Sequence, residues 1–265
     1  MAAKEETLII EYGAVTTVKL NRPNVHNAMN TKMMEELTAF FLQINNEKKI
    51  KLVIIQGEGK SFCAGADLNY MKNIATFGYD KNYEDALKIA TLIKAIYECH
   101  LPTLAVVHGS VYGGANGLIS ACDIVLAEDE TTFAFSEVKL GIAPATIAPF
   151  VIKRIGEFNA KHLMLSGRKF GSIEAKSIGL VTSCHKDTHL SEAVEVYKKE
   201  FESSAPEAVR DTKELIAKVT NQKLDIDEEI KYTSKCIAKL RQGDEGQEGM
   251  SAFLEKRRPK WNKDS

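Results

Sequence analysis

Two segments rich in small residues stand out, because each follows a short apolar run and precedes a helical pattern. Residues 61–68 read SFCAGADL, and residues 108–115 read HGSVYGGA. Small residues at such a turn let a backbone N–H face a ligand with no side chain in the way. Two turns of this kind predict a pair of amide donors that converge on one oxygen, which is an oxyanion hole. The alternative is that both are only tight strand-to-helix connections.

The second turn also has an electrostatic advantage. Gly113 and Gly114 open a helix that is expected over residues 114–121, so unpaired N–H groups and the positive end of the helix dipole lie at the turn. An oxygen that gains negative charge there is stabilised. One such donor lowers the barrier by roughly 2.7–4 kcal/mol.

Short apolar runs alternate with helical patterns along most of the chain, which predicts an α/β fold with largely parallel strands. A helix begins at Asn30 or Thr31, either of which is a good cap, and another is expected over residues 83–99. Residues 72–83 are expected to form a mobile loop beside the first turn. Strands are expected at residues 8–11, 15–20, 52–56, 103–107, 123–127 and 132–135.

From about residue 190 the pattern is helical throughout. Helices are expected at residues 190–203, 207–219 and 225–240, followed by a hinge at 243–249 and an amphipathic tail. This change of pattern predicts two parts, a core of residues 1–195 and a helical C-terminal subdomain of residues 196–265.

The composition argues against several kinds of partner and location. The 265 residues carry 35 Lys and Arg against 36 Asp and Glu, a net charge of −1, so nucleic acid and anionic membranes are poor candidates. The N-terminus lacks the apolar core of a signal peptide, no apolar run is long enough to span a bilayer, and a cytoplasmic location is expected. The five cysteines form no C-x-x-C or metal-binding spacing.

The two turns belong to a longer series of motifs that resembles the crotonase (enoyl-CoA hydratase/isomerase) family. After SFCAGADL and HGSVYGGA come ACDIVLA at residues 121–127 and FSEVKLGIAP at residues 135–144, and the match runs from residues 15–23 to residues 253–257. Residues 113–118 and 136–149 most resemble bacterial hydratases of the 3-methylglutaconyl-CoA kind. The resemblance implies a core spiral of repeated ββα units and a C-terminal trimerisation or lid subdomain.

Carried over by position, the resemblance makes Ala66 and Gly114 the oxyanion-hole amides and Glu137 a catalytic carboxylate. Apolar neighbours of Glu137 favour a partly desolvated general acid/base over an exposed carboxylate paired with Lys139. The groove for coenzyme A would be lined by Val25, Asn27, Ala28, Ala64, Gly65, Asp67, Leu68 and Gly113.

One departure from the family pattern concerns the second catalytic glutamate, which should stand three residues after Gly114. This chain has Gly117 there. Either Glu137 alone activates water, or another residue supplies the second group, or the reaction is a double-bond migration that needs one base. The first expectation is reversible hydration of a 2-enoyl-CoA, of which 3-methylglutaconyl-CoA is one candidate, in leucine degradation or fatty acid metabolism. The alternatives are an enoyl-CoA isomerase and a non-catalytic binding protein.

The resemblance further implies a homotrimer or dimer of trimers and no cofactor apart from the coenzyme A of the substrate. No metal-ligand pattern and no dinucleotide-binding glycine motif occurs. Cys63 is weighed as a nucleophile and set aside, because no base accompanies it. His26 and His108 are read as structural residues. The basic cluster of residues 256–258 is read as a solvated face, with an approach to coenzyme A phosphates of a neighbouring subunit as the alternative.

Overall fold

The computed structural model describes residues 6–221 and 225–262. Its main sheet has the strand order β1-β2-β3-β4-β6-β9. Strands β1 and β2 form an antiparallel hairpin, and every later neighbour pairs in parallel. The strands are β1 (Leu8–Glu11), β2 (Val15–Leu20), β3 (Leu52–Gly57), β4 (Thr103–Val107), β6 (Ile124–Glu128) and β9 (Ser183–His185).

A second, smaller sheet lies beyond the carboxyl end of β4. It has the order β5-β7-β8, formed by β5 (Ser110–Tyr112), β7 (Thr132–Ala134) and β8 (Lys169–Gly171). Strand β5 follows β4 after only two residues, and β7 follows β6 after three. The chain therefore passes from one sheet to the other near the turns that the sequence analysis singled out.

Both faces of the main sheet are buried, which explains why its parallel strands are almost continuously apolar. Val53 and Ile55 of β3 face the larger core, formed with α1 (Thr31–Ile44), α3 (Tyr79–Tyr97), α4 (Gly114–Ala121) and α5 (Ala148–Ser166). Leu52 and Ile54 face the opposite side and pack with Leu190 of α7 (Asp187–Ser203). The alternation follows from the two-residue repeat of a strand.

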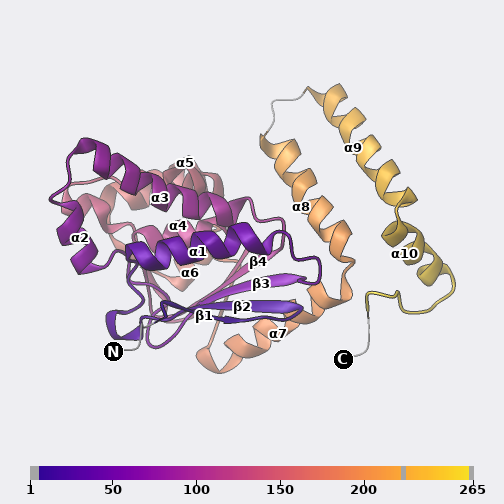
Figure 1. Cartoon of the computed structure of the whole chain (residues 1–265), viewed down its shortest axis with the longest axis horizontal. Helices are drawn as coiled ribbons and strands as arrows, with labels where there is room; N and C mark the ends of the chain where they lie inside the picture. Colours follow the sequence, from indigo (N-terminus) through magenta and orange to yellow (C-terminus); the bar gives the residue numbers. More distant parts are fainter. Residues whose placement is uncertain (1–5, 222–224, 263–265) are drawn as a thin grey trace.

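The C-terminal helices follow α7. Helix α8 (Pro206–Asn221) contacts the body, because Arg210 donates to the Glu47 carbonyl and Lys213 pairs with Asp123. Figure 1 shows α9 (Ile226–Gln242) and α10 (Asp244–Leu254) farther out, apart from the sheet and from α1 to α5. The chain then returns, and the Trp261 indole donates a hydrogen bond to the Ser203 carbonyl at 3.2 Å. The predicted division between residues 195 and 196 falls inside α7 and stays a prediction. No helix among the described residues has the length and apolar character needed to cross a bilayer.

Two sequence predictions are wrong. Residues 72–83 are mostly helical, because α2 (Leu68–Ile74) begins at the Asp67 cap and α3 already starts at Tyr79. Residues 243–249 are a hinge only at Gly243, since α10 begins at Asp244. Gly246 and Gly249 serve close packing: an added Cβ would lie 2.1 Å from the Leu240 carbonyl oxygen and 3.0 Å from the Trp261 ring, respectively.

Some predicted boundaries differ from the observed ones, and some short elements were not predicted. The expected strands at residues 123–127 and 132–135 are displaced by one residue or shortened, and Asn30 rather than Thr31 caps α1. Helix α5, the short helix α6 (Ser172–Ser177) and the 3-10 helices at Pro23–Val25 and Ser136–Leu140 had not been predicted.

Candidate active site

The first small-residue turn is held against the loop of residues 22–29. Met29 pairs with Ala66 as a parallel bridge. The Met29 N–H donates to the Gly65 carbonyl at 2.7 Å, and the Asp67 N–H donates to the Met29 carbonyl at 2.9 Å. Between these two bonds, the N–H of the exposed Ala66 donates to no backbone carbonyl within the described part of the chain. This amide is therefore free to bind a ligand.

The second turn presents the first amide of α4. Gly113 has φ +53° and ψ −127°, a conformation that favours glycine, and its N–H donates to the Ala134 carbonyl at 2.9 Å. Gly114 is the first residue of α4, and an N–H at that position has no partner within its own helix. The fully buried Asn116 side chain fixes the turn through its amide nitrogen, which bonds the carbonyls of Val111, Gly113 and Ala134.

The two turns meet in space. Cys63 pairs with Val111 as a bridge, and the Tyr112 N–H donates to the Cys63 carbonyl at 3.1 Å. A Cβ added to Gly114 would lie 2.8 Å from the Cε of Met29, which is the residue paired with Ala66. The structure thus brings Ala66 and Gly114 close together on either side of Met29, and their role as an oxyanion hole stays a prediction.

Glu137 lies at the same place, in the 3-10 helix Ser136–Leu140 that follows β7. Its Oε1 would be 3.3 Å from a Cβ added to Gly113. Its Oε2 is buried and has no hydrogen-bond partner among the described residues. Burial raises the pKa of this carboxyl, and a hydrogen bond from its own N–H offsets part of the shift. The partial desolvation expected from the sequence is present, no ion pair with Lys139 occurs among the described residues, and the acid/base role stays a prediction.

The position of the missing second glutamate is sterically closed. A Cβ added to Gly117 would lie 2.5 Å from the Ile147 Cγ2 and 2.7 Å from the Ile93 Cδ1. Both isoleucines are buried in the core. A larger side chain at residue 117 would therefore collide with α3 and with the start of α5. The neighbouring Asn116 is turned toward the β5 and β7 carbonyls.

Some of the residues predicted to line a coenzyme A groove are exposed to solvent, and others are buried or hydrogen-bonded within the protein. Val25 and Leu68 are exposed, at 42% and 75%, while Ala28 and Asn27 are buried. The Asn27 side chain accepts from the Arg22 N–H and donates to the carbonyls of Glu58 and Ser61, so it shapes the loop from inside. The backbones of Ala64, Gly65 and Gly113 lie at the two turns.

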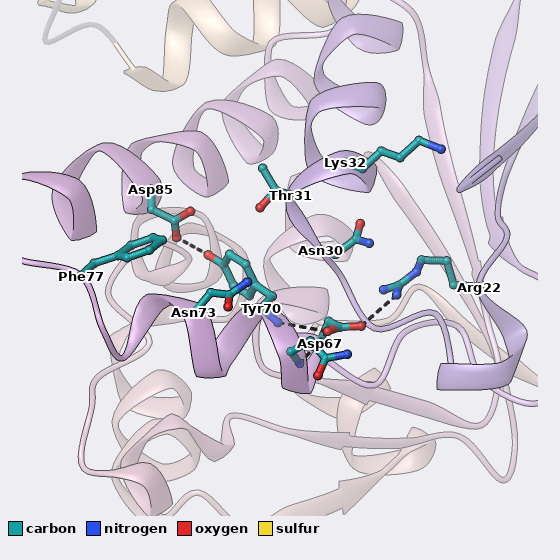
Figure 2. A pocket seen from close by; sticks show the side chains of 10 residues that line it. Arg22, Asn30, Thr31, Lys32, Asp67, Tyr70, Asn73, Phe77 and Asp85 are labelled. Atoms are coloured by element: carbon teal, nitrogen blue, oxygen red, sulfur yellow. Dashed lines mark hydrogen bonds and ion pairs between the residues drawn. The ribbon is translucent and has the colours of Figure 1, made fainter. Parts of the chain in front are cut away.

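The carboxylate of Asp67 is also engaged. It binds Arg22 and caps α2. Figure 2 shows this pair at the edge of a polar cavity of about 340 Å³ between the start of α1, α2 and the start of α3. Arg22 was not among the residues predicted from the sequence.

A larger groove of about 930 Å³, between α8 and the ends of α3 and α4, contains none of the predicted site residues.

Other chemistries find less support. Burial raises the pKa of the Cys63 thiol to about 12, so a thiolate nucleophile is disfavoured. The imidazole Nδ1 of His26 lies 3.1 Å from the Ser61 Oγ, and the Nε2 of His108 lies 2.9 Å from the Gly59 carbonyl. Within residues 6–221 and 225–262, no group of three or more His, Cys, Asp or Glu side chains is arranged to hold a metal ion.

Comparison with known proteins gives a consistent picture. Residues 11–264 match the family model described as enoyl-CoA hydratase/isomerase. A Thermus thermophilus protein provisionally named an enoyl-CoA hydratase is 31% identical over 252 residues, 95% of this chain and 99% of the relative. A peroxisomal dienoyl-CoA isomerase of Arabidopsis thaliana is 29% identical over 255 residues, 92% of this chain and 91% of the relative. A solved structure from Legionella pneumophila, provisionally described as an enoyl-CoA hydratase/isomerase (crotonase), has a TM-score of 0.91 and 39% identity, and the match covers 97% of this chain and 99% of that one.

Proposed function

The chain belongs to the enoyl-CoA hydratase/isomerase (crotonase) family, and from this premise we propose that it migrates the double bond of an enoyl-CoA thioester. The amides of Ala66 and Gly114 would bind the thioester oxygen as it becomes an enolate. Glu137 would remove a proton from the carbon next to the thioester and return it two carbons further along the chain. Coenzyme A enters this reaction only as part of the substrate.

The observation that carries the proposal is the closed position at Gly117. Hydration by two carboxylates needs one group to activate water and another to protonate carbon. Here the second position is occupied by the packing of Ile93 and Ile147, whereas Glu137 has one buried oxygen without a partner among the described residues. Migration of a proton needs only a single carboxylate, and Glu137 would be that carboxylate.

Reversible hydration of a 2-enoyl-CoA, which the sequence placed first, is the second candidate. The Glu137 Oε2, which has no hydrogen-bond partner in the described part of the chain, would accept a hydrogen bond from a bound water. The Thermus relative carries the name of a hydratase. A branched acyl chain such as 3-methylglutaconyl belongs to this candidate, together with its expected place in leucine degradation or fatty acid metabolism.

A panel of acyl-CoA thioesters tests these candidates, with no metal or cofactor added. We expect a 3-enoyl-CoA to gain the near-ultraviolet absorbance of a conjugated thioester. Loss of that absorbance from crotonyl-CoA or 3-methylglutaconyl-CoA, with no reaction of the 3-enoyl-CoA, would favour hydration instead. Binding of the panel without turnover would leave the non-catalytic alternative.

We further propose a homotrimer or dimer of trimers in which the C-terminal helices close over an acyl-CoA groove, in their own or a neighbouring subunit. The support is the apolar surface on these helices. Ile226 and Ile230 of α9 are 67% and 55% exposed, and Phe253 and Leu254 of α10 are 83% and 79% exposed. An assembly that covers these side chains would remove their apolar surface from water.

Light scattering tests the assembly. We expect a trimeric or hexameric mass, and removal of residues 243–265 should both lower that mass and weaken binding of the acyl-CoA. The proposed assembly is wrong if the intact chain is a fully active monomer at micromolar concentration.

A further inference from the structure

Among the residues that the structure describes, one ion pair joins the loop of residues 22–29 to the first turn of the site. The Arg22 Nη2 donates to the Asp67 Oδ2 at 2.9 Å, and the Arg22 Nη1 donates to the Ala28 carbonyl. The Asp67 Oδ1 accepts from the N–H groups of Asn69 at 2.8 Å and Tyr70 at 3.1 Å. One carboxylate thus fixes the loop, the turn and the start of α2 relative to one another (Figure 2).

This pair is sheltered from water, so it differs from an ordinary surface ion pair. The Asp67 side chain is 8% exposed and that of Arg22 is 21% exposed. Burial by itself would raise the pKa of Asp67, but the Tyr70 N–H, the Arg22 guanidinium and the Asn69 N–H together hold it below its usual range. Removing one partner would leave a buried charge uncompensated, which is far more disruptive than losing an exposed pair.

The position of the pair gives it a role in the site. Asp67 directly follows Ala66, and its N–H donates to the Met29 carbonyl beside the bridge that leaves the Ala66 N–H free. The Ala66 N–H belongs to the Gly65–Ala66 peptide group, one peptide before the group that carries the Asp67 N–H. A shift of the Asp67 side chain would therefore displace the adjoining Ala66 backbone and change the direction of the Ala66 N–H. Further along α2, the Tyr70 hydroxyl donates to Asp85 of α3, so the first turn of this helix is also held against α3.

We propose that Arg22 and Asp67 are positioning residues, which aim the Ala66 N–H at the enolate oxygen. The inference rests on the proposed function only in assigning Ala66 to the oxyanion hole. It also gives Asp67 a role different from the coenzyme A contact implied by the family resemblance, because both carboxylate oxygens already have protein partners.

Asp67→Asn is the central test, because asparagine caps a helix as well as aspartate does but carries no charge for Arg22. We expect kcat to fall on the order of 10- to 100-fold, as small misplacements of catalytic groups do, while KM changes little. The bound enolate of acetoacetyl-CoA, read by its near-ultraviolet absorbance, should weaken in parallel. Arg22→Lys, which retains the charge but not the two-pronged contact, should lie between the wild type and Arg22→Met.

The double variant tests whether Arg22 and Asp67 act through the same contact. If both residues act through one contact, Arg22→Met combined with Asp67→Asn should lose little more activity than either change alone. Lys213→Met is the matched control, because Lys213 also has a 20% exposed side chain and forms an ion pair with Asp123 at 2.6 Å. That pair lies at the amino ends of β4 and β6, away from the turns, so kcat should be unchanged.

Wild-type kcat and wild-type enolate absorbance in Asp67→Asn would overturn the positioning role. An equal loss of kcat in Lys213→Met would also overturn it, since any lost ion pair would then have the same effect. A wild-type enzyme that binds acetoacetyl-CoA without enolate absorbance would instead contradict the oxyanion hole itself. Because enolate binding is read without turnover, the test does not depend on whether the reaction is migration or hydration.

Discussion

Glu137→Gln should abolish turnover while leaving acyl-CoA binding nearly intact. The amide has almost the same shape as the carboxyl but cannot accept the substrate proton, so the loss should appear in kcat rather than in KM. General acid/base catalysis contributes about 10²- to 10⁴-fold, and a loss of this size is expected in steady-state assays on the best substrate of the panel. Retention of most of the wild-type rate would mean that Glu137 is not the proton carrier.

The pH dependence of kcat/KM tests the role of Glu137 independently. Because burial raises the pKa of Glu137, the base form of the wild type should be lost at a higher pH than for an exposed glutamate. The value of kcat/KM should fall as pH decreases through that raised pKa. The residual activity of Glu137→Gln should lack this limb.

Stability should change in the opposite direction from activity. A carboxyl whose pKa is raised by folding stabilises the fold most when protonated, and this contribution is lost as the pH rises through the folded-state pKa. At neutral pH the uncharged glutamine avoids the cost of the buried charge. The Tm of Glu137→Gln should therefore equal or exceed that of the wild type at neutral pH, and a lower Tm would point to a structural role.

Local sequence patterns predicted the elements that carry the site. The apolar runs at residues 52–56 and 103–107 became β3 and β4, because strands buried on both faces leave an unmistakable apolar signal. Asn30 caps α1 through the Met33 N–H, as its side chain chemistry predicts. Gly113 and Gly114 begin α4, because glycine readily adopts the positive φ that residue 113 has at this turn.

What the sequence could not predict depends on contacts between distant segments. Residues 72–83 are polar and contain a glycine, yet they include the end of α2 and the start of α3, two helices that the bond from Tyr70 to Asp85 joins. The closure of Gly117 depends on Ile93 and Ile147, which come from other parts of the chain. The role of Arg22 similarly follows only from its contact with Asp67, 45 residues away in the sequence.

Gly114→Pro should also remove most activity, but for a different physical reason. Proline lacks the N–H that would bind the enolate oxygen, and it is tolerated at the first position of a helix, where the N–H has no helical partner. Loss of one oxyanion donor typically lowers kcat by about 10²- to 10³-fold. The matched control is Gly114→Ala, which keeps the N–H but adds the same Cβ, 2.8 Å from the flexible end of Met29.

The comparison between the two Gly114 variants separates the amide from the added bulk. If the N–H matters, proline should lose far more activity than alanine, and only proline should lose the enolate absorbance of bound acetoacetyl-CoA. Equal kcat values in the two folded variants would show that the Gly114 amide does not contact the developing charge. Glu137→Gln should retain that absorbance, because its oxyanion hole is intact. Proton transfer and charge stabilisation can thus be assigned to different residues of one site by a single spectroscopic signal.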